Sequence, residues 1–230
     1  VWDFTSGGCQ QYQTVHVKQT GDDALHGRDA ANAVAAWSVA LGKLARHTDR
    51  DSASRVYVES GTIAIAGNAS FAGNLSLWIK AGATLQVPGS FVVNGGLNIV
   101  VEAGAKIEFT GGANHFTARE IYVGGGGTLQ FRNDTATEYA FLIDGTGGFP
   151  RQGGTLVLAD VALSNPAASA NKYLLSARAA NVDLTIAGGT YPAAADVRLR
   201  AEGGAIRTAA PYTGGWGATV AVSNGKFIHQ

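Results

Sequence analysis

The chain has 230 residues, and its 17 basic and 17 acidic side chains give a formal net charge of zero. This length is sufficient for a buried core, while a charged fraction of only 15%, without a clustered basic face, argues against nucleic-acid binding. The apolar fraction of 46% argues against disorder, and no apolar run is long enough to predict membrane insertion. The 32 glycines and 5 prolines favour many short strands joined by tight turns.

The N-terminal residues carry few signals of their own. The sequence contains no methionine, even at position 1, and no signal peptide is evident. We therefore expect the chain to be a piece of a longer protein. The single cysteine, Cys9, excludes an internal disulfide and a cysteine-based zinc site. The five histidines do not have metal-ligand spacing, so we predict no metal site and no cofactor.

A strand over 14–19 and a helix are the first predicted elements. Asp29 is typical of a helix N-cap. Apolar residues then recur at helical spacing from Ala30 to Leu44, which predicts a helix over 29–45. We take residues 1–50 as an N-terminal segment that contains this helix.

From Arg55 onward the apolar pattern alternates with a period of two, and a unit of about 22 residues repeats. "KAGATLQV" at 80–87 returns as "EAGAKIEF" at 102–109 and, more loosely, as "GGGGTLQF" at 124–131. Because side chains alternate across a strand, apolar residues two apart point to the same side. The predicted inward columns are Ile63, Leu85, Ile107 and Leu129; Ile65, Val87, Phe109 and Phe131; Leu77, Ile99 and Ile121; and Tyr57, Ile79, Val101 and Val123.

A coil of this length holds two or three short strands and cannot bury its inner face alone. Stacking coils about 4.8 Å apart pairs each strand with its equivalent in the next coil. The repeat therefore predicts an all-β fold, a parallel β-helix of about eight coils over 51–230, preceded by a short N-terminal capping helix.

The entry to the repeat has a distinctive order of segments. "TGDDALHGRDAANAVAAWSVAL" followed by "RVYVESGTIAI" combines an aspartate-rich turn, an alanine-rich helix, an apolar strand and a glycine turn. This order resembles the β-helix entry of phage tailspikes and other pectate-lyase-like proteins, in which the helix covers strand edges that the first coil would otherwise expose. The resemblance implies a right-handed β-helix, a homotrimer and a place in a virion. The chain departs from the family at 59–61, where a Pro-Gly turn is common.

The outward positions hold the candidate binding residues. Gln86, Glu108 and Gln130 form one predicted ladder; Ser76, Asn98 and Glu120 form a second, and Trp78, Val100 and Tyr122 a third. Amides and carboxylates bond to sugar hydroxyls and aromatic rings stack on sugar rings. The predicted sugar-binding residues are therefore Trp78, Asn98, Glu108, Glu120, Tyr122 and Gln130. The same columns also fit a plain solvated surface or a subunit interface, which clustered exposed apolar side chains often mark.

No catalytic residue is assigned. Glycoside hydrolysis needs two carboxylates about 5 to 9.5 Å apart, and we expect Glu108 and Glu120 to lie on different faces. Asp144 and Asp160 fall about one coil apart in a region of looser register. No acidic cluster has the spacing of a calcium loop.

Three functions fit these observations. The first is a structural, receptor-binding spike or fibre of a phage-like particle, outside the host cell, that binds bacterial surface polysaccharide and other virion proteins. The second is a polysaccharide depolymerase of the tailspike type, acting as a glycoside hydrolase or lyase. The third is a secreted bacterial adhesin with a β-helix stalk. Low carboxylate density on the coils favours binding over cleavage, and the helical entry favours the phage hypothesis over the adhesin.

Overall fold

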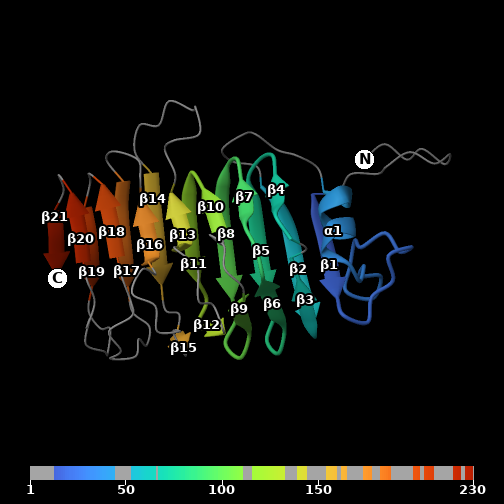
Figure 1. Ribbon diagram of the computed structural model, residues 1–230. Helices are drawn as coiled ribbons and strands as arrows, with labels where there is room; N and C mark the ends of the chain where they lie inside the picture. Colours follow the sequence, from blue (N-terminus) through green and yellow to red (C-terminus); the bar gives the residue numbers. More distant parts are fainter. Residues whose placement is uncertain are drawn as a thin grey trace.

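The computed structural model describes residues 13–44, 53–65, 67–110, 116–132, 139–143, 154–159, 162–164, 173–177, 182–187, 199–202, 205–209, 220–223 and 226–229. Within these residues the strands form three sheets, and strands of the three sheets alternate along the chain (Figure 1). Neighbouring strands within each of these sheets run parallel, as stacked coils require.

The nine-stranded sheet contains, in order, β1 (Thr14–Lys18), β2 (Ser54–Ser60), β5 (Leu75–Ile79), β8 (Gly96–Val101), β11 (Glu120–Gly124), β14 (Gly154–Ala159), β17 (Val182–Ala187), β19 (Ala205–Ala209) and β21 (Lys226–His229). The five-stranded sheet contains β3 (Thr62–Ala64), β6 (Thr84–Val87), β9 (Lys106–Thr110), β12 (Thr128–Arg132) and β15 (Ala162–Ser164). The seven-stranded sheet contains β4 (Ala69–Phe71), β7 (Phe91–Val93), β10 (Phe116–Ala118), β13 (Tyr139–Ile143), β16 (Tyr173–Ala177), β18 (Leu199–Glu202) and β20 (Val220–Ser223).

One coil takes a strand from each sheet in turn, as β5, β6 and β7 illustrate. Each of these strands pairs with its equivalent in the next coil: β5 with β8, β6 with β9 and β7 with β10. The fold is a parallel β-solenoid with one short helix among the described residues, which confirms the fold class predicted from the repeat. The count of eight coils and the right hand stay predictions.

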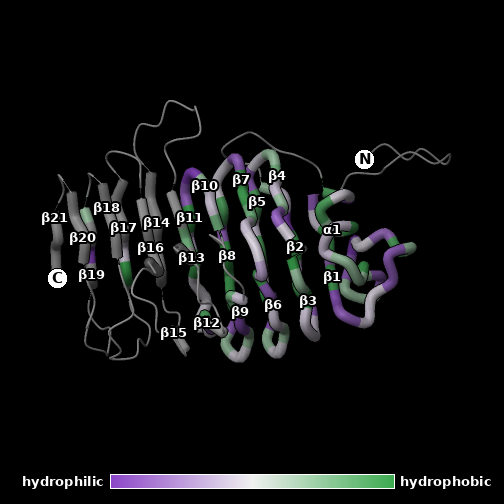
Figure 2. The backbone as a smooth tube through the Cα atoms, in the orientation of Figure 1, coloured by the Kyte–Doolittle hydropathy of each residue, from purple (hydrophilic) through white to green (hydrophobic). Residues whose placement is uncertain are grey.

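The interior is built from residues that the repeat predicts to point inward, although on β11 Ile121 pairs with Leu97 and Val123 with Ile99, two positions from the predicted columns. Along β2, β5 and β8 the hydropathy alternates (Figure 2), as strands with one buried and one solvated face require. The predicted inward residues that are buried are Ile63, Ile65, Leu77, Ile79, Leu85, Val87, Ile99, Val101, Ile107, Phe109, Ile121, Val123 and Leu129. Phenylalanine rings pack in the centre, where Phe116 stacks on Phe141 at 5.6 Å and meets Phe91 edge-on at 6.1 Å.

One inward prediction is wrong. Val58 pairs with Ile79, so Tyr57 pairs with Trp78 and lies half-buried in the outward row of that strand. A slip of one residue moves a side chain to the other face of a sheet. The repeat, extended back from later coils, placed Tyr57 in the column of Ile79. The corner between β2 and β3 is one residue shorter than the corner between β5 and β6, which causes the slip.

The predicted columns, outward as well as inward, are out of register at β11. Asn98 pairs with Tyr122, and Glu120 pairs with Gly96, so the step from β8 to β11 is two residues longer than the step from β5 to β8. The predicted neighbours Asn98 and Glu120, and Val100 and Tyr122, are therefore two positions out of register. A shift of two residues keeps each side chain on its face, so the buried residues of β11 remain buried.

The predicted helix exists but begins later than expected. Helix α1 spans Trp37–Lys43, against the predicted 29–45. Asp29 does not cap it: its carboxylate accepts the backbone N–H of Asn32 at 2.9 Å and the Asn32 side-chain amide at 3.0 Å. Such local hydrogen bonds from aspartate compete with helix formation and hold a turn instead.

The segment before α1 pairs with β1 through Val34. Val34 forms a parallel bridge with Val17, and an Asp23 carboxylate oxygen accepts the backbone N–H groups of Ala35 and Ala36, both at 2.8 Å. These contacts fix the direction in which the chain enters α1. In Figure 2 the hydrophilic residues near the N-terminal end gather in this loop.

Helix α1 and β1 together occupy the N-terminal end of the solenoid (Figure 1). The Trp37 side chain is 3% exposed and meets Phe91 edge-on at 5.8 Å, so the helix packs into the solenoid interior. Strand β1 pairs with β2 and extends the nine-stranded sheet. The domain boundary at residues 50 and 51 stays a prediction, because residues 45–52 lie outside the described part of the chain.

Candidate functional site

The outward side chains of the nine-stranded sheet form rows that cross the strands. One of them, which we call the polar row, consists of Arg55, Ser76, Asn98 and Tyr122, paired in this order on β2, β5, β8 and β11. Arg55, Asn98 and Tyr122 are exposed, and Tyr122 is exposed by 44%. Asn98 Nδ2 donates to Ser76 Oγ at 3.3 Å. The row presents guanidinium, hydroxyl, amide and phenol groups to solvent.

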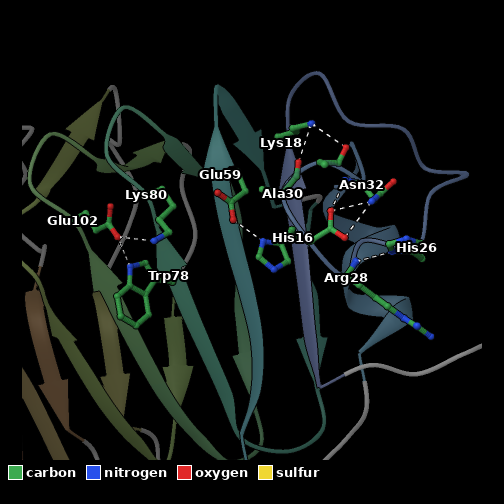
Figure 3. A network of polar contacts seen from close by, with 12 residues as sticks. His16, Lys18, His26, Arg28, Ala30, Asn32, Glu59, Trp78, Lys80 and Glu102 are labelled. Atoms are coloured by element: carbon green, nitrogen blue, oxygen red, sulfur yellow. Dashed lines mark hydrogen bonds and ion pairs between the residues drawn. The ribbon is translucent and has the colours of Figure 1, made fainter. Parts of the chain in front are cut away.

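A second row lies two residues further along each strand. This aromatic row consists of His16, Tyr57 and Trp78. The His16 ring stacks on Tyr57 at 4.9 Å with an interplanar angle of 14°, and Tyr57 stacks on Trp78 at 5.8 Å and 27°. Both faces of the Tyr57 ring are therefore covered by neighbouring rings. His16 Nδ1 lies 2.6 Å from Glu59 Oε1, which links β1 to β2 (Figure 3).

Tyr122 connects the two rows. On β8 and β11 the aromatic row continues as Val100 and Gly124, so its last position has no side chain. A Cβ placed on Gly124 would lie 2.7 Å from the Tyr122 hydroxyl oxygen. The Tyr122 ring therefore leans from the polar row over Gly124 and fills that position.

A cluster around Glu102 borders the aromatic row (Figure 3). Glu102 Oε1 accepts hydrogen bonds from Trp78 Nε1 at 2.6 Å and from Lys80 Nζ at 3.0 Å, and Glu102 Oε2 accepts the Ala81 N–H at 2.9 Å. Lys80 Nζ lies 5.3 Å from the centre of the Trp78 ring and 5.6 Å from that of Tyr57. The repeat copies at 80–87 and 102–109 align Lys80 with Glu102 one coil apart, and the structure confirms this placement.

These contacts hold Glu102 and Lys80 in their charged forms. The N–H of Ala81, with the ammonium of Lys80, keeps the pKa of Glu102 below its ordinary value of 4.5. The hydrogen bond with Glu102 raises the pKa of Lys80 above 10.5. A general acid for glycoside hydrolysis needs a raised pKa, so Glu102 is unsuited to that role.

The ladder on the five-stranded sheet has the predicted register. Glu108 pairs with Gln86 on one side and Gln130 on the other. Gln86 Nε2 donates to Glu108 Oε2 at 2.9 Å, and Lys106 Nζ donates to Glu108 Oε1 at 2.6 Å. Glu108 is only 3% exposed, so its carboxylate is held by protein donors beneath the surface.

The six predicted sugar-binding residues fall on two sheets. Trp78, Asn98, Glu120 and Tyr122 lie on the nine-stranded sheet, and Glu108 and Gln130 lie on the five-stranded sheet. The fold brings Asn98 and Tyr122 side by side, with Trp78 in the neighbouring row. Glu120 pairs with Gly96 and begins a different row. Sugar binding by each of the six stays a prediction.

Sequence reasoning missed Arg55, His16 and Tyr57. For Arg55 and Tyr57 the sequence did contain a signal. The apolar residues Val56 and Val58 of β2 precede their partners on β5 by one residue less than the repeat, which places Arg55 and Tyr57 in the outward rows. His16 lies on β1, before the repeat begins. No periodic signal could therefore have placed it beside Tyr57.

Neither of the carboxylate pairs considered in the sequence is found as a hydrolytic pair among the described residues. Glu108 and Glu120 lie on different sheets, as predicted. Asp144 and Asp160 lie outside the described residues. In the part of the chain that the structure describes, no three His, Cys, Asp or Glu side chains are grouped so that they could hold a metal ion.

Neither the search for membrane-spanning helices nor the comparison with known proteins identifies a function. None of the helical segments in the described ranges has the length and apolar character needed to cross a membrane. Comparison with models of protein families finds no match to the chain. Comparisons with curated proteins and with solved structures also find no significant match.

Proposed function

We propose that this protein is a structural, receptor-binding spike or fibre of a phage-like particle that binds bacterial surface polysaccharide. The binding face is the outer face of the nine-stranded sheet. The observation that carries the proposal is the polar row, in which exposed Asn98 and Tyr122 stand side by side next to Trp78. Amide and phenol groups both donate and accept hydrogen bonds, which suits the hydroxyl groups of a sugar chain.

The solenoid suits the role of a rod that presents such a face. Its strands are paired from coil to coil, and α1 packs into the N-terminal end, where an uncovered coil would expose strand edges. The resemblance of the helical entry to tailspike β-helices supports a location in a virion, contact with other virion proteins and assembly as a homotrimer.

Binding is favoured over cleavage by the state of the carboxylates near this face. Glu102 accepts three hydrogen bonds, and the cause of its lowered pKa is the same set of donors. Cleavage by a pair of carboxylates would require one that stays protonated near neutral pH. Glu108 lies on the five-stranded sheet, where it forms an ion pair with Lys106 of the same strand, β9.

The test is incubation of the purified protein with surface polysaccharides from a panel of bacterial hosts. Retention of a polysaccharide without release of reducing ends or unsaturated sugars is the expected result. Release of oligosaccharides would make the protein a depolymerase instead. Failure to retain any polysaccharide in the panel would contradict the proposed function.

A matched pair of variants locates the binding face. Tyr122→Ala is expected to weaken retention, by about tenfold or more if the ring contacts the sugar. Val92→Ala is the control, because Val92 is also a large exposed apolar side chain, at 36%, but lies on β7 of the seven-stranded sheet. Equal retention by both variants would remove Tyr122 from the binding face. Sedimentation of both variants checks whether either change alters the oligomeric state.

A further inference from the structure

The polar row has a spacing that suits an extended sugar chain. Its four side chains stand on adjacent parallel strands, which are separated by about 4.8 Å. This distance is close to the length of one pyranose unit in an extended polysaccharide. A linear chain that runs along the solenoid axis would therefore meet one side chain of the row with each successive sugar.

Tyr57 offers no free ring face to such a ligand, because His16 covers one face and Trp78 the other. Trp78 is stacked on Tyr57 through one face, and Lys80 Nζ lies 5.3 Å from its ring centre. The polar row therefore supplies the exposed hydrogen-bonding groups of this surface.

Most charges on this face already have partners. Lys80 is paired with Glu102, His16 contacts Glu59, Lys18 Nζ donates to the carbonyl oxygens of Ala30 and Ala31, and Glu120 takes part in a further interaction. Arg55 differs from them. It is exposed, and its guanidinium makes no hydrogen bond or ion pair with the described part of the chain.

A guanidinium that has no partner in the described part of the chain and stands in a hydrogen-bonding row favours a ligand that carries carboxylates. Guanidinium binds carboxylate through two parallel hydrogen bonds, which are stronger and more directional than bonds between neutral groups. We propose that the ligand is a linear acidic polysaccharide, an inference that rests on the proposed polysaccharide binding. The polysaccharide lies along the solenoid axis, with an acidic sugar on Arg55 and the next sugars on Ser76, Asn98 and Tyr122.

The test uses each polysaccharide of the bacterial panel in two forms, native and carboxyl-reduced. Reduction converts each uronic acid to a neutral sugar and leaves the backbone length unchanged. The expected result is that the retained polysaccharides are acidic and that reduction weakens their binding by about tenfold or more. Added salt is expected to weaken binding of the native form alone.

Arginine variants assign this effect to a residue. Arg55→Gln is expected to weaken binding of the native polysaccharide about tenfold, to the level of the reduced form, while Arg55→Lys keeps part of the affinity. Arg28→Gln is the control, because Arg28 is exposed on the loop between β1 and α1. Thermal unfolding of each variant checks that the fold is intact.

The outcomes separate this inference from the proposed function. Equal retention of native and reduced forms, or retention of neutral polysaccharides alone, would overturn the acidic ligand and leave polysaccharide binding in place. Native binding unaffected by Arg55→Gln but lost on reduction would move the acidic contact away from the polar row. No retention of any polysaccharide would overturn both proposals.

Discussion

The five-stranded and nine-stranded sheets belong to the same coils but follow the repeat differently. Over the first four strands of the five-stranded sheet, from β3 to β12, the step is constant, from Ile63 to Leu85, Ile107 and Leu129. In the nine-stranded sheet the step is one residue shorter than this from β2 to β5, equal to it from β5 to β8 and two residues longer from β8 to β11. A sequence repeat therefore reports the register of one sheet without fixing that of its neighbour.

The step from β8 to β11 is longer because two additional residues lie between β9 and β11, and the corner from β11 to β12 is shorter by the same number. The corners after β5 and β8 have equal length, and each contains a glycine with positive φ, Gly82 and Gly104, both at 81°. The corner after β11 is two residues shorter and is built on Gly125 and Gly126, with φ of 106° and 80°. Tight corners of this kind require the backbone freedom of glycine.

The largest expected effect comes from a charge placed in the column that the repeat predicts best. Ile107 is fully buried, with Leu85 and Leu129 on either side. Ile107→Asp buries an unpaired carboxylate and is expected to cost about 4 kcal/mol or more in the free energy of unfolding. Denaturant unfolding measures the loss. An unchanged midpoint would refute the inward assignment of this column.

The second-largest effect is expected in the short corner after β11. A Cβ at Gly127 would lie 2.3 Å from Val101 Cγ1 and 2.7 Å from the Glu102 carbonyl oxygen, whereas a Cβ at Gly104 would have no atom within 4 Å. Gly127→Ala is expected to cost about 2 to 3 kcal/mol through this clash. Gly104→Ala is expected to cost only about 1 kcal/mol through its left-handed backbone. The reverse order in thermal unfolding would mean that the short corner is packed differently.

These two sheets also show how much the sequence could predict. The alternation of apolar residues predicted the solenoid and the buried columns, because burial depends on parity along a strand. Lys80 and Glu102 were placed correctly because the corners after β5 and β8 are equal. Asn98 and Tyr122 were not recognised as neighbours, because two residues are gained between β9 and β11 and two are lost in the glycine corner after β11, which leaves the repeat of the five-stranded sheet unchanged.

The helix illustrates a second limit of sequence reasoning. Apolar residues at helical spacing were expected to continue from Asp29, but the helix begins at Trp37. Asp29 instead holds a turn with Asn32, and Asp23 holds the chain from a position that is distant in sequence. Such long-range side-chain bonds depend on the fold, so local periodicity does not predict them.

A smaller effect is expected at Tyr57, which faces outward beside Trp78 because the step from β2 to β5 is one residue shorter than the repeat. Tyr57→Ser removes ring contacts with His16 and Trp78 and is expected to cost about 1 to 3 kcal/mol, since each of these two aromatic pairs contributes about 0.5 to 1.5 kcal/mol. An inward tyrosine would instead leave a cavity, at a cost of about 3 to 5 kcal/mol. Denaturant unfolding distinguishes the two values. A loss in the higher range would restore Tyr57 to the inward column.

The smallest expected effect concerns the bond that joins the two equal corners. Glu102, in the corner after β8, accepts the N–H of Ala81 in the corner after β5. Because its pKa in the folded protein is lowered, its contribution to stability is present above about pH 4.5 and is lost as the pH falls through the lowered value. Glu102→Gln is expected to cost less than about 1 kcal/mol near pH 7 and to flatten the loss of stability on acidification.

Lys80→Gln is the matched control for that prediction. The Ala81 N–H is the largest single cause of the lowered Glu102 pKa, and Lys80 adds a hydrogen bond and its charge, so this variant is expected to keep part of the acid dependence while losing the ion pair. Thermal unfolding of the wild type and both variants between about pH 3 and pH 7 provides the comparison. If Lys80→Gln flattened the profile as strongly as Glu102→Gln, the acid dependence would come from the ion pair with Lys80 and not from the hydrogen bond with the Ala81 N–H.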